Sequence, residues 1–217
     1  MSLAFGAWSR PGDRPRLGLP VPGGVIDLAG AAGAGAFGDD GDLLRGGNLD
    51  DLLAAGAVAW ERVVATAARL AGAPAGGGDF RVEAGAGGVE WHLPFSVADY
   101  VDFYSSIEHA TNLGRILRPG GEPLLPNWRH LPVGYHGRAG TVVVSGTDVR
   151  RPCGQRKAPT DELPTYGPSQ RLDIEAELGF VVGVPSPLGE RVPTADFARH
   201  TFGVVGLNDW SARDIQA

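Results

Sequence analysis

The chain has 217 residues, 43% of them hydrophobic, with 34 glycines and 17 prolines. That composition allows one large or two small domains with many turns and short strands, and it disfavours a helical bundle. The net charge of -6 at pH 7 provides no basic stripe to neutralise phosphates, so we expect no nucleic acid partner. No apolar run approaches the roughly 20 residues of a membrane span, residues 1–10 lack a signal-peptide core, and the one cysteine, Cys153, allows no internal disulfide. We therefore expect a cytoplasmic protein with no membrane partner.

The first part of the chain is expected to form short strands joined by turns. Residues 16–19 and 24–28 flank a proline and glycine corner at 20–23, a pattern typical of a β-hairpin. Residues 29–47 are rich in glycine and alanine, and we predict that they form a loop.

The clearest helical pattern follows, because apolar residues recur every three or four positions over residues 49–70. Asn48 is a suitable N-cap for this helix. Trp60 lies on the apolar stripe, which favours a place in the core over contact with a ligand. Residues 72–88 have little pattern, and a second, more aromatic domain is expected to begin near Val89.

The segment from residue 105 predicts a helix that runs through residue 117, with Ser105 and Glu108 forming a capping box. His109 would then lie in the first turn, and a neutral histidine can take a proton from water, as a general base must. The alternative is a histidine that packs on its own helix. Asp102 stands just before the cap and can serve either as a metal ligand or as a second cap.

The segment 126–138 is dense in polar and aromatic side chains but has neither a helical nor a strand period. Such a loop is ordered when its polar groups are satisfied or when it lines a site. His130 and His136 have no partner at a metal-ligand spacing, so we interpret both as structural.

Residues 171–182 alternate acidic and apolar side chains with a period of two. On a strand, this period places Asp173, Glu175 and Glu177 on one face and the apolar residues on the other. Carboxylates in a row repel one another unless a positive group lies among them, and a hard divalent cation such as Mg²⁺ or Ca²⁺ is the simplest candidate. The alternative is an exposed acidic face that is merely solvated.

The end of the chain predicts a buried strand at 201–207 and then a turn into a helix over 208–216. Asp209 would stand at the end of that strand. Arg213 and Gln216 are three residues apart, so they can reach the same pocket from one helical face. The alternative is an aspartate N-cap followed by surface arginine and glutamine.

Several long strings, taken in their order along the chain, resemble the fumarylacetoacetate hydrolase family, in particular its fumarylacetoacetases. The strings are DFYSS at 102–106, HATN at 109–112, LPNW at 125–128, LPVGYHGRA at 131–139, VSGT at 144–147 and NDWSARDIQ at 208–216.

The resemblance implies a fold that is mainly β with some helix. An SH3-like barrel domain with one amphipathic helix is expected over residues 1–94. The N-terminal part of a mixed β-roll catalytic domain, truncated, is expected over residues 95–217. Family members are usually homodimers, so we expect a homodimer in the full-length form.

The resemblance also implies the site residues. Four carboxylates would bind Mg²⁺ or Ca²⁺: Asp102, Glu175, Glu177 and Asp209. The general base would be His109 and the oxyanion partner Arg213, and Asp173 is left as a neighbour that is not a ligand. The side chains implied to contact the substrate are Tyr104, Arg118, Tyr135 and Gln216.

The implied activity is metal-dependent hydrolysis of a carbon–carbon bond in the β-diketone 4-fumarylacetoacetate, which gives fumarate and acetoacetate at the end of tyrosine and phenylalanine breakdown. Family members continue for about as long again, so we expect this chain to be an N-terminal portion that is inactive or nearly so alone. Two alternatives stay open. One is another superfamily member, such as an acylpyruvate hydrolase, an isomerase or a decarboxylase. The other is a non-enzyme: a relic, or a subunit that needs a separate C-terminal half.

Overall fold

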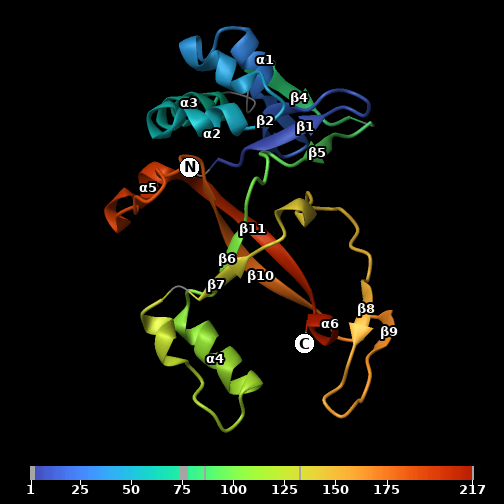
Figure 1. The fold of residues 1–217 in the computed structure, drawn as a ribbon. Coiled ribbons are helices and arrows are strands. Elements are labelled where there is room, and N and C mark those ends of the chain that lie inside the picture. Colours follow the sequence, from blue (N-terminus) through green and yellow to red (C-terminus); the bar gives the residue numbers. More distant parts are fainter. Residues whose placement is uncertain (1–2, 74–77, 86, 132, 217) are drawn as a thin grey trace. The chain divides into compact units, whose positions relative to one another are not determined.

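The computed structural model describes residues 3–73, 78–85, 87–131 and 133–216. They fall into two compact units (Figure 1). The first unit comprises Met1–Phe95 and Val144–Ala217, and the second comprises Ser96–Val143.

A five-stranded antiparallel sheet opens the first unit. Its strands are β1 (Gly6–Ser9), β2 (Arg16–Val21), β3 (Gly24–Asp27), β4 (Arg81–Glu83) and β5 (Glu90–His92), in the order β4-β3-β2-β1-β5. Strands β2 and β3 form the predicted hairpin, and Gly23 takes a φ of 79° in its turn. Glycine suits this turn because a side chain disfavours positive φ.

The expected SH3-like barrel is not seen, because the sheet is open among the described residues. Strand β4 pairs with β3 and β5 pairs with β1, so β4 and β5 lie at opposite edges. Both edge strands are only three residues long. Apolar residues of β2 and β3 instead share one buried cluster with residues of the following helices, so helix packing supplies the core.

Three α-helices lie between β3 and β4 in the sequence: α1 (Leu28–Gly33), α2 (Asp50–Ala55) and α3 (Ala57–Ala71). The prediction of a loop over 29–47 is wrong, because this stretch contains most of α1 and a 3₁₀ helix at Gly38–Leu44. The carboxylate of Asp27 caps α1 by accepting the backbone N–H of Gly30 at 2.9 Å. Burial of Leu28 and two alanines outweighs the low helix propensity of glycine.

The single helix predicted over residues 49–70 is divided at Gly56, whose φ of 82° and ψ of 176° end α2 and begin α3. This conformation is essentially restricted to glycine. The N-cap of α2 is Leu49 rather than the predicted Asn48, although the amide oxygen of Asn48 accepts the N–H of Asp50 at 3.1 Å. Trp60 is buried, as predicted, and its indole N–H donates to the carbonyl of Leu52 at 2.8 Å.

The later part of the first unit contains a short hairpin and a long ribbon. The hairpin is β8 (Cys153–Arg156) with β9 (Thr165–Pro168), and the ribbon is β10 (Leu172–Val182) with β11 (Thr201–Ala212). Helix α5 (Phe197–His200) precedes β11, and α6 (Arg213–Gln216) follows it.

The ribbon confirms the strand predicted at residues 171–182 and corrects the helix predicted over 208–216. Strand β11 continues to Ala212, so only the last four residues are helical. The cause is pairing with β10, in which Asn208 lies opposite Ala176 and Asp209 opposite Glu175. Asp209 is therefore inside a strand rather than at its end.

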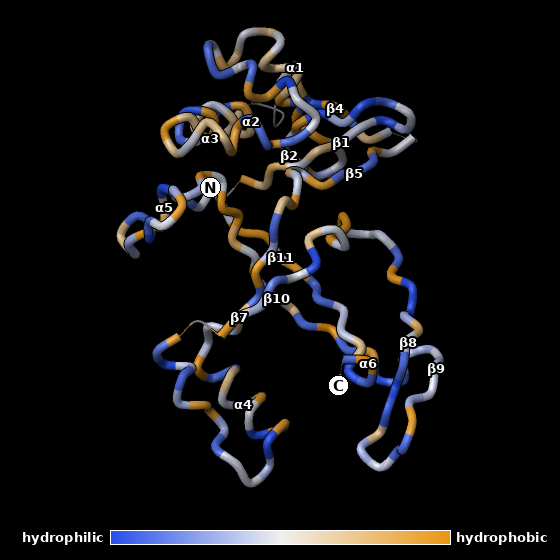
Figure 2. The backbone as a smooth tube through the Cα atoms, in the orientation of Figure 1, coloured by the Kyte–Doolittle hydropathy of each residue, from blue (hydrophilic) through white to orange (hydrophobic). Residues whose placement is uncertain are grey.

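One end of the ribbon is anchored in the core. Val181 belongs to the buried cluster, and the rings of Trp60 and Phe202 meet edge to face with centroids 5.4 Å apart. A Cβ atom on Gly183 would lie 2.6 Å from the Trp60 ring, so only glycine fits there without a shift. Figure 2 shows hydrophobic residues continuing from the core into the ribbon.

The second unit has β6 (Val101–Phe103) paired with β7 (Gly134–His136), and helix α4 (Ile107–Leu117). The N-cap is Ser106 rather than the predicted Ser105, because the Ser106 hydroxyl accepts the N–H of His109 at 3.2 Å. His109 does lie in the first turn. None of the helices in the described ranges has the length and apolar character needed to cross a membrane.

Candidate functional site

The predicted site residues divide between the two units. The first unit holds Glu175, Glu177, Asp209, Arg213 and Gln216. The second unit holds Asp102, Tyr104, His109, Arg118 and Tyr135.

Strands β10 and β11 bring three of the four predicted metal ligands onto one face of the ribbon. Glu175 lies directly opposite Asp209, and Glu177 is two positions further along β10, so their side chains share a face. One carboxylate oxygen of Glu177 and one of Asp209 lie within 4.8 Å of each other. Oxygen atoms bound to one Ca²⁺ at about 2.3–2.6 Å can be this far apart. Glu177 and Asp209 therefore suit a hard divalent cation, whereas Glu175 is paired with Arg213 and is not among the carboxylates that come this close.

Arg213 supplies positive charge to the same face. Its Nε donates to Asp173 Oδ2 at 3.1 Å, its Nη2 donates to Glu175 Oε1, and its Nη1 donates to Gln216 Oε1 at 3.2 Å. Arg213 and Gln216, predicted to share one helical face, are thus hydrogen-bonded to each other. Sequence reasoning missed the contact of Arg213 with Asp173 and Glu175, although the row of carboxylates already indicated that a positive group should lie among them.

Hydrogen bonds and ion pairs on this face shift two pKa values. The backbone N–H of Ile174, followed by the Arg213 guanidinium, lowers the pKa of Asp173 from its ordinary value. Burial alone would lower the pKa of Arg213, but hydrogen bonds to Glu175 and Asp173 outweigh it and raise that pKa. Both groups are therefore held in their charged forms, and the face carries a fixed ion cluster.

In the second unit, the fourth predicted ligand, Asp102, lies opposite Tyr135 in the β6–β7 pair. The Tyr135 hydroxyl donates to the Asp102 carboxylate at 2.6 Å, so two predicted site residues are joined directly. On the other face of this pair, Nε2 of His136 contacts Oδ1 of Asp99. The backbone N–H of Tyr100, followed by His136, lowers the pKa of Asp99.

Tyr104 and His109 are also neighbours, since their rings meet edge to face with centroids 6.1 Å apart. Tyr104 lines a hollow of about 310 Å³ together with residues 103, 105, 128–131 and 133. The indole N–H of Trp128 donates to the carbonyl of Tyr104 at 3.1 Å, which fixes one wall of the hollow. Residues 128–131 and 133 of the segment predicted as a loop therefore line this hollow beside a predicted substrate residue. The segment is not wholly irregular, because it contains a 3₁₀ helix at Pro126–Arg129 and strand β7.

Within the second unit, the hydrogen bonds of Arg118 go to backbone carbonyls and not to another predicted site residue. Its Nη2 donates to the carbonyl of Pro123 at 2.8 Å and its Nε to that of Glu122 at 3.4 Å. The guanidinium thus closes the turn after α4, and no sequence pattern that we used indicated this role.

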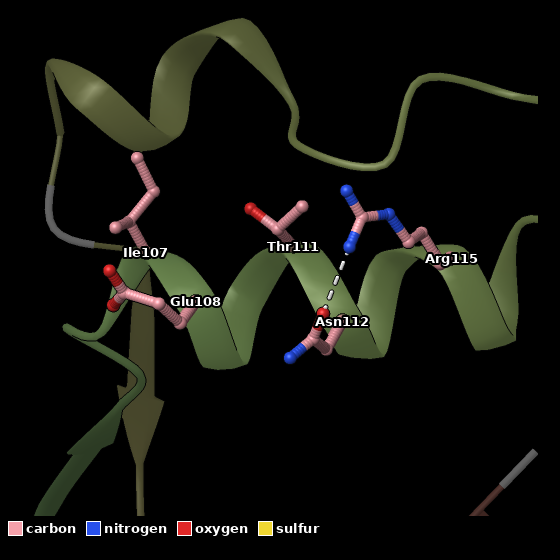
Figure 3. A pocket seen from close by; sticks show the side chains of 5 residues that line it. All are labelled: Ile107, Glu108, Thr111, Asn112 and Arg115. Atoms are coloured by element: carbon pink, nitrogen blue, oxygen red, sulfur yellow. Dashed lines mark hydrogen bonds between the residues drawn. The ribbon is translucent and has the colours of Figure 1, made fainter.

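A second hollow, of about 260 Å³, lies along one face of α4 and is lined by Ile107, Glu108, Thr111, Asn112 and Arg115 (Figure 3). Asn112 accepts a hydrogen bond from Arg115 at 3.0 Å. None of the five is a predicted site residue, and a hollow lined by a single helix encloses little. We therefore place the candidate chemistry on the ribbon, on β6–β7 and at the start of α4, where His109 lies beside Tyr104.

Comparison with known proteins shows the family of the chain. The family profile described as fumarylacetoacetate (FAA) hydrolase C-terminal matches residues 100–217, more than half of the chain. A protein of Caenorhabditis elegans named fumarylacetoacetase is 58% identical over 127 residues, which cover 58% of this chain and 30% of the relative.

Two further relatives with the same name match along the whole chain. The human protein is 39% identical over 231 residues, covering 99% of this chain and 54% of the relative. The rice protein is 39% identical over 232 residues, covering 100% of this chain and 54% of the relative. The chain thus spans about half the length of these relatives. It belongs to the fumarylacetoacetate hydrolase family.

Proposed function

We propose that this chain takes part in metal-dependent hydrolysis of the carbon–carbon bond of 4-fumarylacetoacetate, a β-diketone, to fumarate and acetoacetate. The observation that carries the proposal is the ribbon face that bears Glu175, Glu177 and Asp209, on which Glu177 and Asp209 lie close together and Glu175 is paired with Arg213. The relatives named fumarylacetoacetase support the choice of substrate. This reaction would place the protein at the end of tyrosine and phenylalanine catabolism.

The proposed ligands of a divalent cation, Mg²⁺ or Ca²⁺, are Asp102, Glu175, Glu177 and Asp209. Such a cation, when bound, polarises a carbonyl and stabilises negative charge on a leaving enolate. Carboxylates suit both ions because both are hard and prefer oxygen. Tyr135 would orient the Asp102 carboxylate through the hydrogen bond that joins them.

The proposed general base is His109, which would take a proton from the attacking water. Its place beside Tyr104, a proposed substrate contact, supports this role because the base must lie near the reacting carbonyl. Arg213 and Gln216, which are already hydrogen-bonded to each other, would stabilise the developing oxyanion. Arg118 and Tyr135 are the remaining proposed substrate contacts.

The test is turnover of fumarylacetoacetate, with and without Mg²⁺ or Ca²⁺. It would be run on the chain alone and on the chain mixed with the part of the human relative that it does not match. We predict metal-dependent turnover in the mixture and a loss of about 10²–10⁴-fold with His109→Gln. Little or no turnover is expected from the chain alone.

Two results would contradict the proposal. Faster hydrolysis of a smaller acylpyruvate would favour another superfamily activity, and unchanged turnover in His109→Gln would remove the proposed base. A rate for the isolated chain near that of the full human relative would contradict the expectation of inactivity. The homodimer and the cytoplasmic location stay predictions.

A further inference from the structure

The Arg213 guanidinium is shared by two carboxylates of β10. Its Nε and Nη2 lie 3.1 and 3.0 Å from Asp173 Oδ2, and its Nη2 also contacts Glu175 Oε1. The backbone fixes the start of this arm, because the N–H of Arg213 donates to the carbonyl of Arg171 at 3.0 Å. The side chain therefore leaves α6 and reaches back over the face of the ribbon that carries Glu175.

Asp173 is held at both of its oxygens. Its Oδ1 accepts the backbone N–H of Ile174 at 2.9 Å, and its Oδ2 accepts from Arg213. Its side chain is 54% exposed and that of Glu175 is 34% exposed. The Asp173 carboxylate is therefore paired with Arg213 and does not point toward another ligand.

Glu175 is in a different position. Among the described residues, its recorded side-chain contacts both fall on Oε1, from Arg213 and from the hydroxyl of Ser211 at 3.5 Å. Its Oε2 is therefore the oxygen that can turn to a cation. A guanidinium and a divalent cation repel each other and compete for one carboxylate, so the more firmly Arg213 is drawn to Glu175, the weaker the cation binds there.

We propose that Asp173 is a positioning residue that anchors the Arg213 guanidinium and shares its charge, which leaves Glu175 Oε2 for a divalent cation. This inference rests on the metal site of the proposed function. It gives a role to the one carboxylate of the acidic face that is not a proposed ligand. Because Asp173 acts through Arg213, its effect must disappear when Arg213 is removed.

The first measurement needs no metal. The side-chain Nε–H signal of Arg213 would be followed by NMR in the wild-type protein, in Asp173→Asn and in Asp173→Glu. We expect a resolved, slowly exchanging signal in the wild type, its loss in Asp173→Asn and its recovery in Asp173→Glu. An unchanged signal in Asp173→Asn would overturn the anchoring role.

The second measurement is Mg²⁺ and Ca²⁺ binding by calorimetry. Residues that orient metal ligands typically contribute about 10–100-fold in affinity, so we expect Asp173→Asn to bind that much more weakly. The double variant Asp173→Asn/Arg213→Gln should recover affinity because the competing cation is gone. Asp148→Asn, which neutralises an exposed aspartate outside the ribbon, is the matched control and should bind as the wild type does.

The outcomes separate this inference from the proposed function. Equal affinity in Asp173→Asn and the wild type would overturn the inference and leave the metal site standing. Equally weak binding in the single and double variants would also overturn it, since Asp173 would then act without Arg213. No binding by the wild type would contradict the metal site, while the Nε–H signal would still decide whether Asp173 anchors Arg213.

Discussion

In the N-terminal part of the first unit the apolar side chains are inside, whereas on the β10–β11 ribbon many of them are outside. Leu52 and Val63 are fully buried, but Leu178 and Phe180 are 71% and 56% exposed. The exposed apolar residues lie on the face opposite the carboxylates, because neighbours along a strand point in opposite directions. The core thus supplies stability, and the ribbon supplies the candidate chemistry.

The difference teaches how the site is supported. A two-stranded ribbon alone is at best marginally stable in water. In the first unit this ribbon has its apolar anchor at one end, where Val181 and Phe202 join the core beside Trp60. At its other end, polar contacts of α6 hold the ribbon in place. The positions of the proposed ligands therefore depend on apolar packing at one end of the ribbon and on hydrogen bonds at the other.

The largest expected effect contrasts a buried leucine with an exposed one. Leu52→Ala should lower the free energy of unfolding by about 2–5 kcal/mol, because it leaves a cavity in a filled core. Leu178→Ala on the ribbon should change it by no more than about 0.5 kcal/mol. Chemical denaturation of both variants measures the contrast. A similar loss in both would show that the outer face of the ribbon is buried in solution.

A smaller effect is expected where the ribbon packs against Trp60. Gly183→Ala would place a methyl group 2.6 Å from the Trp60 ring, and overpacking of this kind costs about 1–3 kcal/mol. The control is Gly203→Ala on the neighbouring strand, where a Cβ meets nothing within 4 Å. Thermal unfolding and tryptophan fluorescence would report the change. If the two variants behave alike, the ribbon does not dock on Trp60 as described.

The smallest effect on stability is expected at the polar contacts of α6. Asp214 accepts the Ser169 hydroxyl at 2.6 Å and the Gln170 N–H at 2.7 Å, and these bonds, in that order, lower its pKa from the ordinary 3.8. A depressed carboxyl pKa stabilises the fold above the unfolded value, and this stabilisation is lost as pH falls through the folded pKa.

We therefore predict that stability declines below about pH 4 and that part of this decline is absent in Asp214→Asn. The measurement is the unfolding midpoint between pH 2 and 6, in both proteins. Identical pH profiles would mean that the Asp214 contacts contribute nothing. Asp161→Asn, an aspartate in the loop between β8 and β9, serves as the reference for removing a carboxylate elsewhere.

Local sequence patterns predicted the parts of the fold that local geometry controls. The period of two over residues 171–182 predicted β10 and the shared face of its carboxylates. The apolar stripe around Trp60 predicted helix and burial but not the break at Gly56, because one glycine within an apolar stripe carries no sign of its φ. Residues 208–212 were misassigned because their strand exists through pairing with β10, a contact distant in sequence.

The site was predictable as a set of residues but not as a set of contacts. Strand period and family resemblance named Glu175, Glu177 and Asp209, and the ribbon places these three on one face. The bonds from Arg213 to Asp173 and Glu175 depend on where α6 follows β11. Tyr135 and Asp102 likewise meet through a strand pair joined by about thirty intervening residues. Such contacts follow from tertiary pairing, which single-sequence patterns do not encode.

The measurement that tests the central claim most directly is calorimetric titration of the purified chain with Mg²⁺ and Ca²⁺. It would compare the wild type, Glu177→Gln and, as a control, Glu190→Gln, which removes an exposed carboxylate outside the ribbon. We predict saturable binding in the wild type and in Glu190→Gln, and loss of binding in Glu177→Gln. Absence of binding in the wild type, or equal binding in all three proteins, would contradict a metal site on the acidic face.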